Sequence, residues 1–208
     1  MLGQLQVGDH SSAEGSFPIA RGSRDGSLVV QQGHAKFQEA VYRGNCWAVA
    51  DQTGKTMPAG LSASPTTVTL FNPKGSNMLA VIWGAWLVNT VDPGVAIAEI
   101  WIGANVNIEM AAVTGTAGVP RNCMIGNAKA PSISTFTTAT LPEAPVAIDV
   151  LGVIMAGAIT VETQSISMGN WYDGSLILYP GGALSFQASA ASGAAAAFAS
   201  WIWEEVLI

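Results

Sequence analysis

The sequence predicts an all-β protein, an antiparallel β-sandwich preceded by an extended N-terminal arm. Short runs rich in Val, Ile, Thr and aromatic residues recur along the chain, and turn-forming residues separate them, which is typical of a sandwich. Residues 1–30 are rich in Gly, Ser and Gln and lack such periodicity, which predicts the arm. The expected organisation is therefore an arm over residues 1–30 and a single sandwich domain over residues 31–208.

The strand pattern begins after the arm, and tight turns divide it. Pro93-Gly94 and Pro180-Gly181-Gly182 combine the fixed φ of proline with a glycine that accepts positive φ, which suits such turns. The segments that we expect to form strands, from their composition and spacing, cover residues 36–43, 45–51, 66–72, 78–89, 95–103, 146–154, 158–163, 174–180, 182–189 and 196–206.

Several of these segments are apolar on both faces. In residues 95–102, Glu99 and Trp101 share one face with valine and isoleucine, and the other face carries only alanine and isoleucine. A sheet with one solvated face alternates apolar residues inward and polar residues outward. We therefore expect the second face to be covered, either by another sheet or by a neighbouring subunit.

Two regions depart from simple alternation. Residues 104–145 are rich in Gly, Thr, Ala, Pro and Ser, and because structureless loops of this length are uncommon, we expect one or two short strands there plus loops for partner contacts. Residues 188–199 are rich in alanine, which favours a helix by propensity. Gly193 interrupts that run, however, and alternating stretches flank it, so we expect a hairpin with its turn near Ser192-Gly193.

The charge content argues against several functions. Only 11% of the residues are charged, against about a quarter in an average soluble domain, and the formal net charge is -6. An acidic, sparsely charged chain lacks the basic footprint of a nucleic-acid partner. Its apolar runs are shorter or more interrupted than the roughly 20 residues of a membrane span. Charge this sparse predicts that the domain hides surface against copies of itself or against a scaffold.

Catalytic, cofactor and metal motifs are absent from the sequence, so we expect no enzymatic activity and no cofactor. Residues 54–56 resemble the end of a phosphate-binding loop, but Val49 stands where that motif needs glycine. His10 and His34 have no second ligand at metal-binding spacing. Cys46 and Cys123 are either two free thiols or one long-range bridge, and the sequence leaves that choice open.

The most unusual feature is a set of seven tryptophans. Aromatic side chains of this size fill sandwich cores, line subunit interfaces or form ligand platforms. Trp201 and Trp203 lie on one face of a single expected strand, which suits either an inter-sheet core or a symmetry axis. The candidate oligomer-interface residues are Trp101, Trp201, Trp203 and Tyr42.

Four segments carry a resemblance to a known group of proteins. They are GSLVV at 26–30, GHAKFQEAVYRGN at 33–45, SLILYPGG at 175–182 and SWIWEE at 200–205. Together they resemble virion structural proteins of tailed bacteriophages, of the capsid decoration or cement type, over most of the chain except 104–145. The matching positions are turn and strand residues, so the resemblance transfers no active-site residues.

The resemblance implies a jelly-roll-like sandwich, with the PGG segment in a hairpin, that forms homotrimers on the outer surface of the capsid. Such trimers bind the major capsid protein and cement neighbouring subunits, without a nucleic-acid or membrane partner. The arm and residues 104–145 are then expected to contact the capsid, and the aromatic strand faces to form the trimer. Two alternatives remain open, a tail-associated or receptor-binding module of the same particle and a carbohydrate-binding, lectin-like domain.

Overall fold

A computed structural model of the chain describes residues 21–22, 28–29, 37–90, 97–155, 166–192 and 197–208. The chain divides into two compact units, residues 1–39 and 40–208. The described part of the first unit includes β1 (Arg21–Gly22) and β2 (Leu28–Val29), which pair antiparallel. Most of the arm that the sequence predicts lies outside the described residues.

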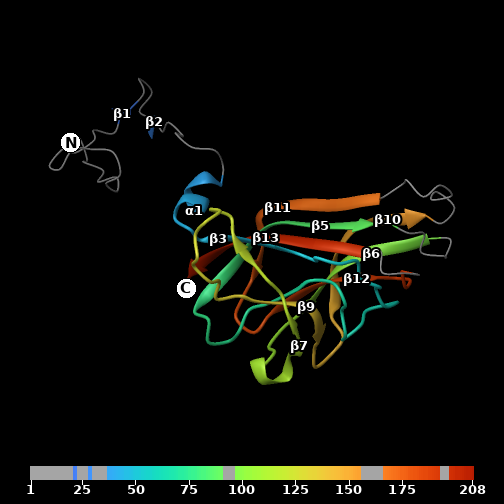
Figure 1. The fold of residues 1–208 in the computed structure, drawn as a ribbon. Coiled ribbons are helices and arrows are strands. Elements are labelled where there is room, and N and C mark those ends of the chain that lie inside the picture. Colours follow the sequence, from blue (N-terminus) through green and yellow to red (C-terminus); the bar gives the residue numbers. More distant parts are fainter. Residues whose placement is uncertain (1–20, 23–27, 30–36, 91–96, 156–165, 193–196) are drawn as a thin grey trace. The chain divides into compact units, whose positions relative to one another are not determined.

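The second unit is the antiparallel β-sandwich that the sequence predicts, with two sheets packed against each other (Figure 1). One sheet contains, in spatial order, β10 (Val146–Met155), β6 (Ile97–Asn105), β12 (Ala183–Ala188), β4 (Thr69–Phe71), β9 (Ser134–Thr140) and β7 (Thr114–Ala117). The other sheet contains β11 (Ile166–Leu178), β5 (Met78–Asn89), β13 (Ala197–Leu207), β3 (Cys46–Ala50) and β8 (Arg121–Asn122). Strands β10 and β7 form the edges of the first sheet, and β11 and β8 form those of the second.

Successive strands often change sheet, from β3 through to β6 and again from β10 through to β13, which is a jelly-roll-like alternation. Two expected hairpins are therefore wrong. The turn at Pro180 joins β11 to β12 across the sandwich, with positive φ at Gly181. The Ala-rich segment likewise connects β12 in one sheet to β13 in the other, because each strand buries its own apolar face by entering a different layer.

The expected strand at 36–43 is also wrong, since α1 (Gln38–Tyr42) occupies that position. Gln, Glu and Ala favour a helix there. Gly44, at φ 67°, ends it, and the Gly44 and Asn45 amides donate to the carbonyls of Val41 and Ala40. This is the αL cap that glycine supplies most readily.

Most other strands lie close to their expected positions, and β5 covers residues 78–89 as predicted. Strand β11 begins earlier than expected, because the sheet absorbs Asp173 and Gly174, both at positive φ, as an irregularity between Trp171 and Leu176. Residues 104–145 hold three strands, β7, β8 and β9, where one or two were expected, and the 3-10 turn η1 (Met110–Ala112). The strand expected at 158–163 lies outside the described residues.

The core fills the space between the two sheets. Strand β13 turns Trp201 and Trp203 inward, and neither side chain has exposed surface. The centroid of the Trp201 ring lies 4.6 Å from that of the Phe186 ring in the opposite sheet. The Trp201 Nε1 donates a hydrogen bond to the Val68 carbonyl at 2.9 Å. This hydrogen bond satisfies the indole donor, which burial removes from water. Because side chains alternate along a strand, β13 presents Phe198, Ser200, Ile202 and Glu204 on the outside of the sandwich.

Candidate interaction surface

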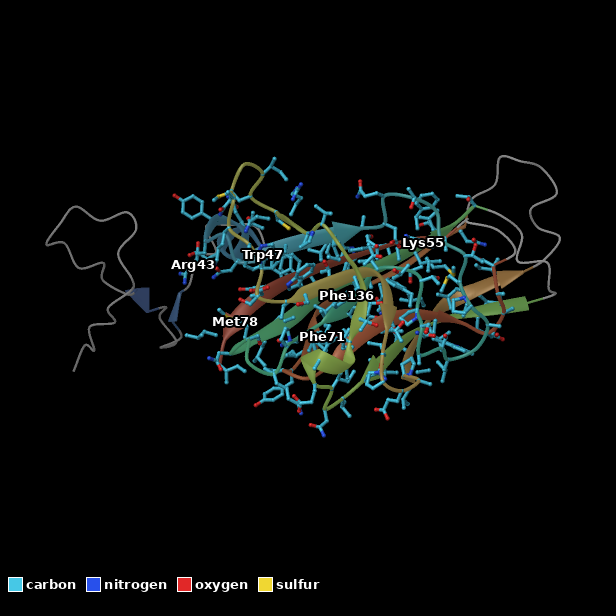
Figure 2. All side chains as sticks on the ribbon, turned by 60° about the horizontal axis from the view of Figure 1, so that its bottom comes forward. Arg43, Trp47, Lys55, Phe71, Met78 and Phe136 are labelled. Carbon is cyan, nitrogen blue, oxygen red and sulfur yellow. The ribbon has the colours of Figure 1, made fainter. Side chains whose placement is uncertain are left out.

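The outer face of the six-stranded sheet is largely covered by loops of the same chain. Phe71 and Phe136, labelled in Figure 2, point outward from β4 and β9 and belong to a second apolar cluster. Its remaining members come from the segments around them and are Ile108, Val113, Ala139, Leu141 and Ala183. Backbone hydrogen bonds from Ile108 to Gly181 and from Leu141 to Ala63 hold these loops in place.

Polar side chains on this outer face are also paired by the covering loops. Gln187 points outward from β12 yet is buried, and its Oε1 accepts from the Ser62 amide at 2.8 Å. Its Nε2 donates to the Ser185 hydroxyl, also at 2.8 Å. The loops that cover β12, β4 and β9 are thus fixed by specific hydrogen bonds and belong to the folded domain.

The outer face of the five-stranded sheet has a different character. The register of β11, β5 and β13 aligns four cross-strand rows on this face, and Trp171, Ile177 and Phe198 are 56%, 51% and 37% exposed there. We call this surface the open face. Its apolar members are Val81, Trp86, Val88, Trp171, Ile177, Phe198 and Ile202.

Trp86 lies flat on the open face because two glycines leave room for its ring. A Cβ at Gly84 would lie 2.2 Å from Cη2 of Trp86, and one at Gly169 would lie 1.9 Å from its Cδ1. The Trp86 ring meets the Trp171 ring edge-on, with centroids 4.8 Å apart and an interplanar angle of 80°. The open face is therefore a preformed aromatic surface.

The four rows that define the open face contain a single charged residue, Glu204. Burial raises the pKa of this carboxyl above its usual value, while a hydrogen bond from Trp83 and the nearby charge of Arg43 act in the opposite direction. Arg43 lies at one end of the sandwich and Lys55 toward the other (Figure 2). The centre of the open face offers a partner apolar contact rather than charge.

A second exposed apolar surface follows the edge strand β10. We call it the β10 ridge, and its members are Val146, Ile148, Val150 and Val153. Beside it, a crevice of about 240 Å³ is lined mainly by apolar side chains, including Val106, Ile148 and Ile177. Drug-sized ligands usually occupy pockets of about 300 Å³ or more. The crevice is better understood as part of a larger apolar surface.

The four residues expected at an oligomer interface lie in three different settings. Trp201 and Trp203 fill the core, so the interface assignment needs correction for these two, because side chains without exposed surface contact no other copy. Trp101 is half-buried on the outer face of β6, opposite Val150 of the β10 ridge. Tyr42 is 71% exposed at the end of α1. For Trp101 and Tyr42, contact with another copy stays a prediction.

Sequence reasoning did not single out the open face. The alternation of β13 separates Phe198 and Ile202 from the buried tryptophans, but it does not reveal which of the two sides a loop covers. The signal that could have found this surface is the pair Gly84 and Gly169 beside Trp86, since glycine inside a strand often marks a close approach by another group.

Titratable groups form no evident reaction centre in the described ranges. No group of three or more His, Cys, Asp or Glu side chains there could hold a metal ion. His10 and His34 lie outside those ranges. Burial raises the pKa of Asp51 to about 6, but its Oδ2 accepts from the amides of Val68 and Ala199 and so holds the fold together. No described helix has the length and apolar character needed to cross a membrane.

Comparisons with known proteins identified no relative of this chain. No protein-family model matches the chain, and neither a curated protein nor a solved structure matches it significantly.

Proposed function

We propose that this chain is a non-enzymatic structural protein that assembles with copies of itself through the open face. In the setting that the bacteriophage resemblance implies, it forms trimers on the capsid exterior and cements neighbouring major capsid subunits. The observation that carries the self-assembly proposal is the exposure of Trp171, Ile177 and Phe198 on a sheet face whose four rows hold one charge. Exposed apolar surfaces of this kind mark interaction sites in soluble proteins.

A second copy of the chain fits the open face better than a charged partner does. An apolar surface gains most from an apolar partner, and charged groups placed against it would lose hydration without compensation. In a trimer each subunit offers one surface to one neighbour and a different surface to the other. The open face and the β10 ridge supply two such apolar surfaces on the same subunit.

The capsid location rests on the four sequence segments that resemble phage decoration proteins. Binding of trimers to an assembled lattice would stabilise that lattice by mass action, since the trimer binds the assembled form. The sparse charge and acidic balance of the chain are compatible with an exterior position, away from packaged DNA.

Adding purified protein to undecorated heads tests this proposal. The wild-type protein is expected to bind in hundreds of copies per head, and Trp171→Glu to bind at least tenfold more weakly, because a buried carboxylate would face the neighbouring subunit. Leu61→Glu is the matched control, since Leu61 is an exposed apolar residue on a loop away from the open face. Absence of wild-type binding to heads, or recovery of a few copies on tails alone, would reject the capsid assignment in favour of the tail-associated alternative.

A further inference from the structure

Cys46 and Cys123 meet at the edge of the five-stranded sheet. Strand β8 pairs with β3 so that Trp47 lies opposite Asn122, and continuing this register by one residue places Cys46 opposite Cys123. The Cys123 amide donates to the Cys46 carbonyl at 2.9 Å, and the two Sγ atoms lie 3.0 Å apart. From this geometry we propose that the two thiols form a reversible disulfide and make a redox-sensitive modification site, independent of the proposed assembly.

Hydrogen bonds around the pair hold both backbones in position before any bond forms. The Asn122 side chain donates to the Gly44 carbonyl at 2.8 Å, and the Lys129 ammonium donates to the Asn45 side chain at 2.7 Å. The sulfur atoms therefore need to approach by only about 1 Å to reach the length of a disulfide bond. Such an approach is within the range of side-chain rotation and small backbone shifts.

The two thiols differ in ways that fix the order of the reaction. Cys46 has no exposed surface, whereas Cys123 is partly exposed, so an oxidant reaches Cys123 first. The Cys46 thiol donates a hydrogen bond to the Cys123 sulfur, which lowers the pKa of Cys123 and raises that of Cys46. Cys123 is thus the better nucleophile and Cys46 the resolving thiol.

With glutathione disulfide as the oxidant, the atoms and electrons balance in two exchanges. The Cys123 thiolate attacks one sulfur of glutathione disulfide, forms a mixed disulfide and releases one glutathione thiolate. Cys46 then loses its proton to solvent or to that thiolate, attacks the Cys123 sulfur and releases the second glutathione. Two protein thiols are oxidised, and one glutathione disulfide is reduced to two glutathione molecules.

The bond would tie together residues 77 positions apart in sequence. Closing a loop of that length restricts the unfolded chain, and it is expected to raise the Tm by roughly 10 °C in a domain of this size. It would also fasten the residue that follows the edge strand β8 to the neighbouring strand β3. Oxidation thus strengthens the sheet that carries the open face.

The test uses the full chain, purified under reducing conditions and then incubated with glutathione disulfide. We expect the mass of the intact protein to fall by about 2 Da, with no titratable thiol after denaturation and a higher Tm that dithiothreitol reverses. Cys46→Ala is expected to keep one glutathione on Cys123, because the resolving thiol is absent. Cys123→Ala is expected to take up little glutathione, since Cys46 is buried.

Three results would overturn the proposal. They are two free thiols in the treated wild-type protein, a disulfide found only between chains, or a stable glutathione adduct on wild-type Cys123. Each variant is compared with itself in the oxidised and reduced states, so a loss of stability caused by the substitution alone does not imitate the expected result. The redox-dependent Tm shift is expected in the wild type and absent from both variants.

Discussion

The outer faces of the two sheets differ, although the strands that form them have similar apolar patterns. On the six-stranded sheet, Phe71 and Phe136 point outward and are buried beneath loops of the same chain. On the five-stranded sheet, Trp171 and Ile177 point outward and are more than half exposed. The difference shows that the apolar outer face of one sheet can be buried by loops of the same chain, while that of the other sheet stays exposed and available to a partner.

The largest effect on folding is expected from breaking the intrachain cover. Phe71→Ala should lower the free energy of unfolding by about 3–5 kcal/mol, because it removes a fully buried ring from the second apolar cluster. Phe198→Ala on the open face should cost at most about 1 kcal/mol in the dissociated subunit. Urea titrations at low protein concentration compare the two. Equal losses would mean that Phe198 is as important to the folded subunit as Phe71.

Self-association should depend on the open face rather than on the cover of the six-stranded sheet. Ile177→Lys is expected to weaken self-association by about 2–3 kcal/mol, or roughly a hundredfold in the dissociation constant, because it buries an unpaired ammonium at the interface. Ile125→Lys, at an exposed loop position, provides the control. Sedimentation equilibrium measures both constants. Unchanged association in Ile177→Lys would remove the open face from the interface.

A smaller effect concerns pH and the buried Asp51. Its pKa is raised from 3.8 to about 6 in the folded state, so the folded protein binds this proton more tightly than the unfolded chain does. Raising the pH from about 4.5 to 7.5 therefore lowers stability, by roughly 2 kcal/mol from this residue alone. Asp51→Asn should remove that component from the pH dependence of chemical unfolding. An identical pH profile in wild type and variant would contradict the assignment.

The smallest effect is expected at the ion pair between Lys74 and Glu109. Both side chains are substantially exposed, so water screens the attraction. Glu109→Gln should change the unfolding free energy by less than about 0.5 kcal/mol, as measured by thermal denaturation. A loss above about 2 kcal/mol would mean that this pair, and not the apolar packing of Ile108 and Val113, holds the covering loop.

The sequence predicted the sandwich and many of its strands, because period-two alternation survives wherever one face meets the core. Strand β5 was predicted on a different signal, a continuous apolar run that turn residues bound at both ends. The α1 helix was missed because its ending depends on the positive φ of Gly44. The connections at Gly181 and Ser192 were predicted as hairpins because turn residues do not indicate whether the next strand joins the same sheet or the opposite one.

The candidate surface was less predictable than the fold. Apolar composition predicted contact with a partner, but long-range packing decides which aromatic residues remain outside. Trp201 and Trp203 enter the core on one side of β13, while Phe198 emerges on the other. The loops that cover Phe71 come from segments distant in sequence, and no local pattern identifies them.

The central claim is that another copy of the chain covers the open face, and the molar mass in solution tests it most directly. Light scattering coupled to size-exclusion chromatography, with wild-type protein at tens of micromolar, should give a discrete oligomer, with a trimer as the expected species. A single species at the 21.4 kDa monomer mass throughout that range would contradict the claim.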